Sequence, residues 1–407
     1  MLSIGHGAER VTVEQGEPMG GYADRPSGVD GTLDPLEAHA ISLTDGVHRF
    51  VLVTVDLICV NTDLVAQVRD TVGDRLGVDS CWVSATHTHA SPEAGCHPGG
   101  AATPEPVAAR VVRACVAAIE RAVAQEEACS VHPVRALVGG LAGPRNAPPS
   151  EQAVLPVDAV AFAAEGGIRG LLTVTPVHPT VFGADNNAVS ADLVGGIRRA
   201  LAARTNAWVV SATGAAGDVS TRHTRTARSS GEIARLGQLV ADALLPLTVE
   251  AEGVDEGVLA PPIRRRVDLL PKTPGELADL PRLLTGEHSD AETRSESVLR
   301  QGAVIAAGLA ADARTAPYAV DLEVVRLGPV LLVAVPGELF LALGEEIRAR
   351  LAASSAAIVL GYTNGYLGYL PTHDAGPCYE VLASPVTSGS GKKLADTAVT
   401  LAKEILR

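Results

Sequence analysis

The chain has 407 residues, of which 46% are hydrophobic and 20% are charged, so it can bury one large core or two modest ones. Its 47 Asp and Glu residues outnumber its 33 Lys and Arg residues, which gives a formal net charge of -14. Nucleic-acid binding needs a basic face, and the densest basic run is only Arg264 to Arg266. We therefore exclude a nucleic-acid partner.

The amino-terminal stretch MLSIGHGAERVTVEQGEP lacks the basic start and apolar segment of a secretion signal, and nowhere do eighteen apolar residues follow one another. We predict a cytoplasmic protein without stable membrane association, and the oligomeric state stays open, a homo-oligomer included. The six cysteines form no CxxC pair and mostly lie in apolar runs, which predicts reduced, buried thiols.

In chain order, Val- and Leu-rich runs alternate with Ala-rich stretches, which predicts an α/β fold of mixed sheets layered with helices. Strands are expected at 49–60 and 81–85 around a helix at 64–76, and a long helix at 104–125 follows. Hairpins are expected at 157–175 and 322–335, around turns that contain glycine. The remaining expected elements are strands at 206–212 and 356–360 and helices at 191–204, 231–245, 292–311, 339–351 and 393–406.

The region 260–297 combines proline, glycine and charge, and we interpret it as a surface insertion or lid within a single domain that spans residues 1–407.

Several predicted strands end in residues that can bind metal or move protons. His87 and His89 follow one strand in SATHTHASP, His178 follows another in TPVHP, and Glu338 follows a third in VPGEL. Two neutral imidazoles and a carboxylate are a common ligand set of catalytic zinc, and histidine favours zinc over Mg²⁺ or Ca²⁺. The HxH pair alone is weak evidence, because histidines at strand ends are often hydrogen-bonded in turns.

Five motifs follow one another in the order seen in the neutral/alkaline (non-lysosomal) ceramidases. They are SATHTHASP, TPVHP, GAAGDVS, VPGEL and NGYLGYLPT, the last followed by CYE. The early MGGYADR also resembles the glycine-tyrosine turn of that family. The resemblance extends from about Gly5 to the C-terminal helix. It implies a single ceramidase-like zinc hydrolase domain that corresponds to the catalytic domain of the family.

The resemblance also implies one zinc ion per chain and a role for each site residue. The implied metal ligands are His87, His178, Glu338 and Tyr369. The implied catalytic residues are His89, Ser220 and Tyr379. The implied substrate-binding residues are Gly21, Tyr22, Arg145 and Asn146, and Asp56 and Asp218 are expected to support the ligands from outside.

In this interpretation, His89 points the same way as His87 because the two lie two residues apart in an extended segment, and it transfers a proton. The Tyr379 hydroxyl stabilises the oxyanion, and Ser220 is either a nucleophile or a hydrogen-bonding partner of the substrate. GDVS lacks the GxSxG elbow of serine hydrolases.

Structural alternatives stay open for individual residues. Asp56 either caps a helix or partners an imidazole, and Asp218 either stabilises a turn or supports the site. Glu338 is also a favoured type of residue at a helix N-terminus, Tyr22 could belong only to a turn, and Tyr366 is expected to pack in the core.

The predicted reaction is hydrolysis of a linear N-acyl amide bond by a metal-activated water. Three features depart from the family. The family's Asn-Arg-Ser-Pro-like segment reads Pro-Arg-Asn-Ala-Pro at 144–148, and aromatic residues make up only 3% of the chain. We also expect neither a secretion signal nor the extra immunoglobulin-like domain of secreted ceramidases. These departures favour a soluble N-acyl amine over membrane ceramide. The alternatives are ceramide hydrolysis, ester hydrolysis or deacetylation at the same site, or a binding protein that retains the fold.

Overall fold

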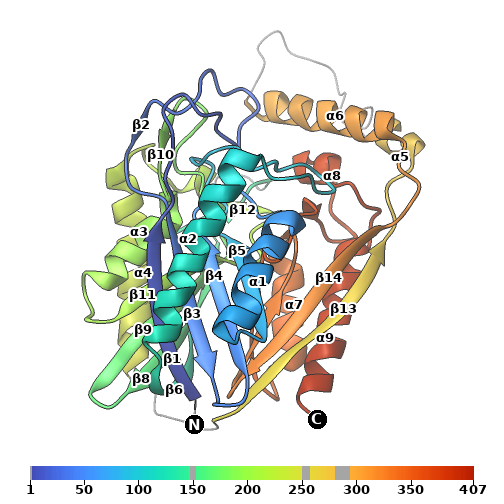
Figure 1. The fold of residues 1–407 in the computed structure, drawn as a ribbon. Coiled ribbons are helices and arrows are strands. Elements are labelled where there is room, and N and C mark those ends of the chain that lie inside the picture. The colour runs from blue at the N-terminus through green and yellow to red at the C-terminus, as the bar shows by residue number, and fades with distance from the viewer. Residues whose placement is uncertain (1, 147–152, 250–256, 280–293) are drawn as a thin grey trace.

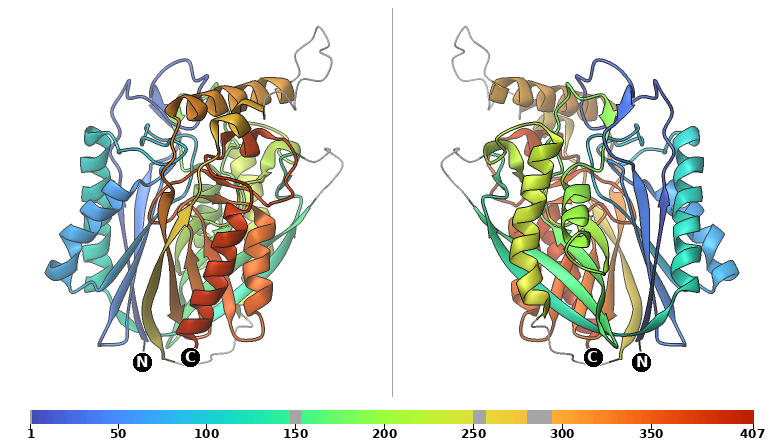
Figure 2. Two further views of the ribbon diagram at one scale, coloured as in Figure 1. Left: turned by 90° about the vertical axis from the view of Figure 1, so that its right-hand side faces the viewer. Right: turned by 90° about the vertical axis from the view of Figure 1, so that its left-hand side faces the viewer.

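The computed structural model describes residues 2–146, 153–249, 257–279 and 294–407, which form two β-sheets with helices on their outer faces (Figure 1, Figure 2). The larger sheet has eight strands in the order β11 (Trp208–Thr213), β9 (Gly167–Thr175), β8 (Val154–Ala164), β6 (Glu127–Gly139), β1 (Leu2–Arg10), β3 (Glu37–Thr44), β4 (Arg49–Val55) and β5 (Ser80–Ala85). The smaller sheet has the order β13 (Leu259–Leu269), β14 (Tyr318–Leu327), β15 (Val330–Ala334) and β17 (Ala356–Leu360).

The two sheets pack against each other through one apolar layer. Phe50, Trp82 and Phe162 of the larger sheet join Leu332 and Ile358 of the smaller sheet in this layer. The Trp82 indole N–H donates a hydrogen bond to Glu323 across the layer (2.7 Å). The polar edge of the indole is therefore satisfied while its ring stays in the core.

Helices cover the outer faces of both sheets and close one end of the molecule. On the larger sheet lie α1 (Thr62–Leu76), α2 (Glu105–Ala124), α3 (Asp192–Ala202) and α4 (Ser230–Val249), and on the smaller sheet lie α7 (Leu341–Leu351) and α9 (Ser390–Ile405). At one end of the molecule, α5 (Pro274–Asp279) and α6 (Arg294–Asp312) cross above α8 (Tyr379–Ala383) (Figure 1). Within the described residues, no helix is long and apolar enough to cross a bilayer.

Three parallel strand pairs end at one place. These pairs are β4 with β5, β9 with β11, and β15 with β17. Beyond their ends, the Gly361 N–H donates to the Thr213 carbonyl (3.1 Å), and the Thr213 hydroxyl donates to the Thr86 carbonyl (2.7 Å). The loops that leave β5, β11 and β17 are thereby held side by side.

Short strand pairs and bridges fix the register of the loops beyond these ends. Within β16 (Glu338–Leu339) and β18 (Tyr369–Leu370), Glu338 lies opposite Tyr369. The pair β7 (Gly143–Pro144) and β12 (Val219–Ser220) brings the segment before Arg145 next to Ser220, and Ser220 also bridges to His178. A further short pair joins β2 (Gly31–Thr32) and β10 (Ala188–Val189), and one turn of 3-10 helix follows β12 at Thr221–His223.

The α/β class and the order of the predicted elements are confirmed, but two predictions were wrong. The strand predicted at 49–60 ends at Val55, and residues 56–60 form a buried loop instead. The region 260–297 begins as a strand of the smaller sheet, with a register shift between Ala260 and Ile263, and residues 280–293 lie outside the described part. Because β13 is an edge strand, it tolerates the prolines and arginines that suggested an irregular insertion. Strands β1, β3 and β6 of the larger sheet were not predicted from the sequence.

A partly buried histidine in β1, His6, makes stability depend on pH. The His6 ring stacks between His39 (5.6 Å between centroids) and Trp208 (4.9 Å). Burial, together with His39 and Arg198, lowers the pKa of His6 from 6.5 to about 3, although Glu37 opposes this shift. The folded protein therefore resists a proton that the unfolded chain accepts below pH 6.5.

We expect the free energy of unfolding to fall as the pH drops from 6.5 towards 3, by up to about 1.4 kcal/mol per pH unit from this one group. His6→Gln removes the titration and should flatten that part of the curve, as measured by urea denaturation at a series of pH values. The exposed His97, changed to Gln, is the control and should keep the wild-type slope. An unchanged slope in His6→Gln would contradict this account.

Candidate functional site

The ends of the parallel strands bring three histidines together. His87 and His89 follow β5, and His178 follows β9. One ring nitrogen from each histidine lies within 4.8 Å of those of the other two, and His87 and His178 are almost completely buried. Within the described chain, this is the one group of three or more His, Cys, Asp or Glu side chains placed to hold a metal ion.

The backbone at His87 differs from the prediction. His87 has φ 65°, in the left-handed region, so the HxH segment is not extended and the alternation rule does not apply. The rings of His87 and His89 instead meet edge to face, with centroids 4.9 Å apart and their Nε2 atoms 3.3 Å apart. The two histidines do share one site, as predicted, but the predicted reason was wrong.

The left-handed conformation at His87 is accompanied by strain on the facing loop. Tyr362 (φ 55°) and Asn364 (φ 64°) are also left-handed, and the Tyr362 ring stacks on the His87 ring at 4.0 Å. Non-glycine residues in this region cost about 1–3 kcal/mol each and concentrate at functional sites. The Asn364 side chain accepts a hydrogen bond from the Val83 N–H (3.0 Å), which connects the loop to β5.

Backbone carbonyls orient all three imidazoles. The Nδ1 atom of His87 lies 2.6 Å from the Ile58 carbonyl, that of His178 lies 2.7 Å from the Ala216 carbonyl, and that of His89 lies 2.9 Å from the Gly21 carbonyl. A carbonyl only accepts, so each Nδ1 carries the proton and each Nε2 presents a lone pair. This pattern of partners is typical of histidines that bind metal.

Glu338 completes the cluster from the smaller sheet. Its Oε2 lies 2.9 Å from His178 Nε2 and 3.4 Å from His87 Nε2. The Tyr366 hydroxyl donates to Oε1 (2.5 Å), and the Tyr362 hydroxyl lies 3.4 Å from Oε2. Tyr366 was predicted to pack in the core, and that interpretation was incomplete because its hydroxyl holds the carboxylate.

The electrostatics leave the cluster ready to bind a cation. Burial alone would raise the pKa of Glu338, but His87 and His178 lower it well below the ordinary value. Burial and Arg145 lower the pKa of His178 to about 4, against the opposing effect of Glu338. Burial, followed by His87 and His178, lowers the pKa of His89 well below 6.5. At neutral pH the site therefore presents an ionised carboxylate at Glu338 and neutral imidazoles at His178 and His89, which are protonation states that suit a metal ion.

Arg145 lies beside the cluster, although its segment at 144–148 departs from the corresponding segment of the ceramidase family. Its Nη1 donates to the Tyr369 hydroxyl (3.1 Å) and lies 3.4 Å from His178 Nε2. Its Nε lies 3.2 Å from Glu380, and the Asn146 amide donates to the other oxygen of Glu380 (2.9 Å). A buried glutamate that the sequence analysis did not single out thus holds both predicted substrate-binding residues of this segment.

The three predicted catalytic residues lie around the same cluster. His89 is one of the three histidines, and the Tyr379 ring packs edge to face on Tyr369 at 5.8 Å. Ser220 is buried beside His178, and its Oγ accepts a hydrogen bond from the Arg222 N–H (3.3 Å). Among the described residues, no histidine or carboxylate makes a hydrogen bond to the Ser220 hydroxyl, so the geometry favours a hydrogen-bonding role over that of a nucleophile.

The two predicted supporting carboxylates have different places. Asp218 accepts a hydrogen bond from the Leu341 N–H (2.8 Å), so it fixes the start of α7 directly after Glu338. Asp56 pairs with Arg198 (3.0 Å) and accepts from the Glu37 N–H (3.0 Å). The prediction that Asp56 supports an imidazole was wrong, because β4 ends one residue before it and the Ile58 carbonyl takes the position beside His87.

Gly21 and Tyr22 lie behind His89. The Tyr22 ring lies 5.0 Å from the His89 ring, and its hydroxyl donates to the Phe182 carbonyl (2.8 Å). A Cβ atom on Gly21, which has φ 93°, would lie 2.8 Å from the His89 side chain. The contacts of both residues position the imidazole, whereas the sequence analysis had expected contacts with the substrate.

Sequence reasoning missed Tyr362, Glu380 and the hydroxyl contact of Tyr366. The only signal in the sequence was the clustering of tyrosines around NGYLGY and the glutamate in CYE. Nothing local distinguishes a tyrosine that stacks on an imidazole from one that fills a core. Their roles depend on loops that meet only after the two sheets pack.

The fold defined by these two sheets is shared with solved ceramidase structures. The crystal structure of neutral ceramidase from Pseudomonas aeruginosa matches with a TM-score of 0.77 at 18% identity, over 100% of this chain and 74% of that chain. A structure of a ceramidase complexed with C2 matches with a TM-score of 0.75 at 17% identity, over 99% of this chain and 75% of the other. No protein-family model and no curated protein matches the sequence. The chain therefore has the neutral-ceramidase fold, as its motifs predicted.

The contact between Gly21 and His89 can be tested with a matched pair of variants. Gly21→Ala and Gly16→Ala both place a side chain at positive φ, but a Cβ on Gly16 meets no atom within 4 Å. Both variants should lose about 1–2 kcal/mol of stability from backbone strain. Only Gly21→Ala should also displace His89, which NMR of ¹⁵N-histidine-labelled protein would detect as a change in the ring-nitrogen shifts of His89. Equal His89 spectra in the two variants would refute this positioning.

Proposed function

We propose that this protein is a zinc-dependent hydrolase that cleaves a linear N-acyl amide bond. The observation that carries the proposal is the convergence of three Nε2 atoms beside the Glu338 carboxylate, with each Nδ1 atom held by a backbone carbonyl. The ceramidase structures that share the fold are named for an amide-cleaving activity, which supports the same reaction class.

In this proposal, His87, His178 and Glu338 hold one zinc ion, and Tyr369 lies opposite Glu338 as a further ligand. The residues fit the ion because buried neutral imidazoles with a carboxylate form a typical zinc donor set. When bound, zinc lowers the pKa of a coordinated water from about 15.7 to about 7 and polarises a carbonyl oxygen. The role of the other residues is to move protons and stabilise charge.

His89 is the proposed general base and acid. Its Nδ1 proton is engaged by the Gly21 carbonyl, so Nε2 is free to accept a proton from the attacking water. The same proton can then pass to the leaving amine. Its lowered pKa keeps the ring neutral before the reaction, as a base requires.

Tyr379 and Arg145 are the proposed stabilisers of the oxyanion. The Tyr379 ring packs on Tyr369, and the Arg145 guanidinium lies over the Tyr379 ring at 6.0 Å. Both side chains thus lie beside the proposed ligands, where negative charge develops on an amide carbonyl under attack. The Arg145–Glu380 pair holds the guanidinium in place.

Elemental analysis of protein purified without added metal should find about one zinc per chain. His178→Ala should lose both the metal and activity, because it removes a ligand. His89→Ala should keep most of the zinc and reduce turnover about 100- to 10,000-fold, the usual effect of losing a general base. Equal metal loss in both variants would show that His89 is a ligand, and full activity in metal-free protein would refute the zinc mechanism.

The substrate is proposed to be a soluble N-acyl amine. Arg145 and Asn146, with the Glu380 carboxylate, form a polar wall beside the cluster. We expect turnover of at least one soluble N-acyl amine to equal or exceed that of detergent-dispersed ceramide, in a screen that varies acyl length and headgroup and includes matched esters. Strong ceramide hydrolysis without turnover of any soluble amide would overturn this prediction, and a preference for esters would change the reaction class. The cytoplasmic location and the lack of stable membrane association stay predictions.

A further inference from the structure

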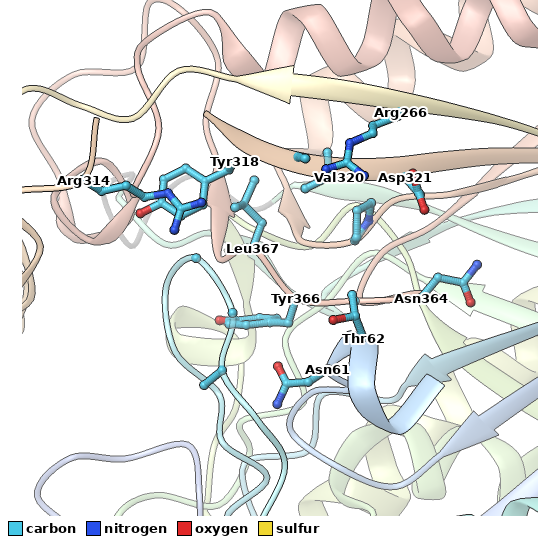
Figure 3. Close-up of a pocket in the computed structure, with 16 residues that line it drawn as sticks. Asn61, Thr62, Arg266, Arg314, Tyr318, Val320, Asp321, Asn364, Tyr366 and Leu367 are labelled. Carbon is cyan, nitrogen blue, oxygen red and sulfur yellow. The ribbon is translucent and has the colours of Figure 1, made fainter. Parts of the chain in front are cut away.

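A cavity of about 460 Å³ lies between α1, the loop at 99–101, strands β13 and β14, and the loop at 364–367 (Figure 3). Its lining includes Asn61, Thr62, Arg266, Arg314, Tyr318 and Tyr366. None of them has a role in the proposed hydrolysis except Tyr366, which contacts Glu338.

Tyr366 is the wall between this cavity and the candidate site. Its hydroxyl donates to Glu338 (2.5 Å), and the same side chain lines the cavity. The side chain is neither fully buried nor fully exposed. The cavity therefore lies about one tyrosine side chain away from the cluster of ring nitrogens, close enough for one elongated ligand to occupy both.

The described lining of the cavity carries two arginines, Arg266 and Arg314, and one carboxylate, Asp321. Arg266 forms no ion pair or hydrogen bond with any residue in the described part of the chain, whereas its neighbours Arg264 and Arg265 pair with Glu323 (3.3 Å) and Glu404 (3.0 Å). Asp321 is the one acidic residue of the described lining, and it lies 3.8 Å from Arg264. Asp321 lies opposite Arg266 in the β13–β14 register but forms no ion pair with it, and the exposed Arg266 guanidinium is accessible to a ligand.

Arg314 adds a second positive group in a fixed position. Its guanidinium stacks on the Tyr318 ring at 4.2 Å and donates to the Ala316 (3.0 Å) and Pro317 (3.3 Å) carbonyls. These contacts neutralise no charge, because carbonyls and an aromatic ring are uncharged. They hold the guanidinium in one orientation, which reduces the entropy that binding an anion would cost.

The floor of the cavity adds a buried polar atom without a partner. Asn61 is 1% exposed, and its amide donates to the Ala94 carbonyl (2.8 Å), but its Oδ1 has no hydrogen-bond partner. Figure 3 shows the Asn61 oxygen on the side of its amide nearer Tyr366. A buried acceptor without a partner costs about 1–3 kcal/mol, which a ligand carrying an N–H or O–H group would recover.

We propose that this cavity binds a carboxylate at one end of the substrate, so that the enzyme acts on N-acyl amides that carry a carboxylate some distance from the scissile bond. The proposal rests on the proposed amidase function. Arg266 and Arg314 receive the carboxylate, and Asn61 accepts from an N–H or O–H group where the spacer between the carboxylate and the amide carries one. Because Tyr366 separates the two sites, a spacer of several bonds must connect the carboxylate to the amide.

The test is a series of N-acetyl ω-amino acids from N-acetylglycine to 6-acetamidohexanoate, each compared with the neutral N-acetyl alkylamine of equal length. We expect KM to be lowest for the longer carboxylates. Arg266→Gln should raise their KM about tenfold and leave the KM of the neutral amides unchanged. Arg265→Gln is the matched control, because its guanidinium pairs with Glu404, and it should behave as wild type. Equal KM values for charged and neutral substrates, or an Arg266→Gln variant with wild-type selectivity, would overturn the proposal.

Calorimetry with 6-acetamidohexanoate separates failure of this proposal from failure of the hydrolase assignment. If no amide is cleaved, the hydrolase assignment fails, but binding that weakens in Arg266→Gln and persists in His178→Ala still supports a carboxylate site. Absence of binding, or binding that does not depend on Arg266, overturns the carboxylate site whatever the enzyme hydrolyses.

Discussion

The arrangement of the site depends on one buried carboxylate. Glu338 is 1% exposed, and an ionised group so far from water is stable only with close partners. The Tyr366 hydroxyl donates to one oxygen, whereas the Nε2 atoms of His178 and His87 lie 2.9 and 3.4 Å from the other and present lone pairs, so the proposed metal ion would complete the compensation. These partners come from β9, β5 and the loop after β17, so the requirement to compensate one charge ties both sheets together at their parallel ends.

Close backbone packing holds that carboxylate in place. A Cβ atom on Gly217 would lie 2.4 Å from the Glu338 carbonyl oxygen, so only glycine allows the loop after β11 to approach β16 this closely. The Gly217 N–H donates to the Leu339 carbonyl (2.9 Å), and Asp218 accepts from the first N–H of α7. The segment GAAGDVS therefore acts mainly as a support for Glu338 and, through the Ala216 carbonyl, for His178.

The cluster and the neighbouring cavity differ in how their charges are balanced. In the cluster, Arg145 is held between Glu380 and Tyr369, and Glu338 accepts a hydrogen bond from the Tyr366 hydroxyl. In the cavity, Arg266 and Arg314 have no carboxylate partner within the described chain. Arg266 and Arg314 are exposed, so water solvates them in the absence of a ligand, whereas buried charges need partners within the protein.

The sequence by itself determined the α/β class, the order of most elements and the meeting of His87, His178 and Glu338, because the motifs of these three residues directly follow apolar runs. It also determined which residue types are present to bind a metal ion. Only the tertiary structure decided the orientation of the imidazoles, since this depends on the carbonyls of Ile58, Gly21 and Ala216 from three separate loops. The tertiary structure also decided that Asp56 pairs with Arg198 and Glu380 with Arg145. Such long-range charge pairs depend on how the sheets and loops pack, and they leave no periodic signal in the sequence.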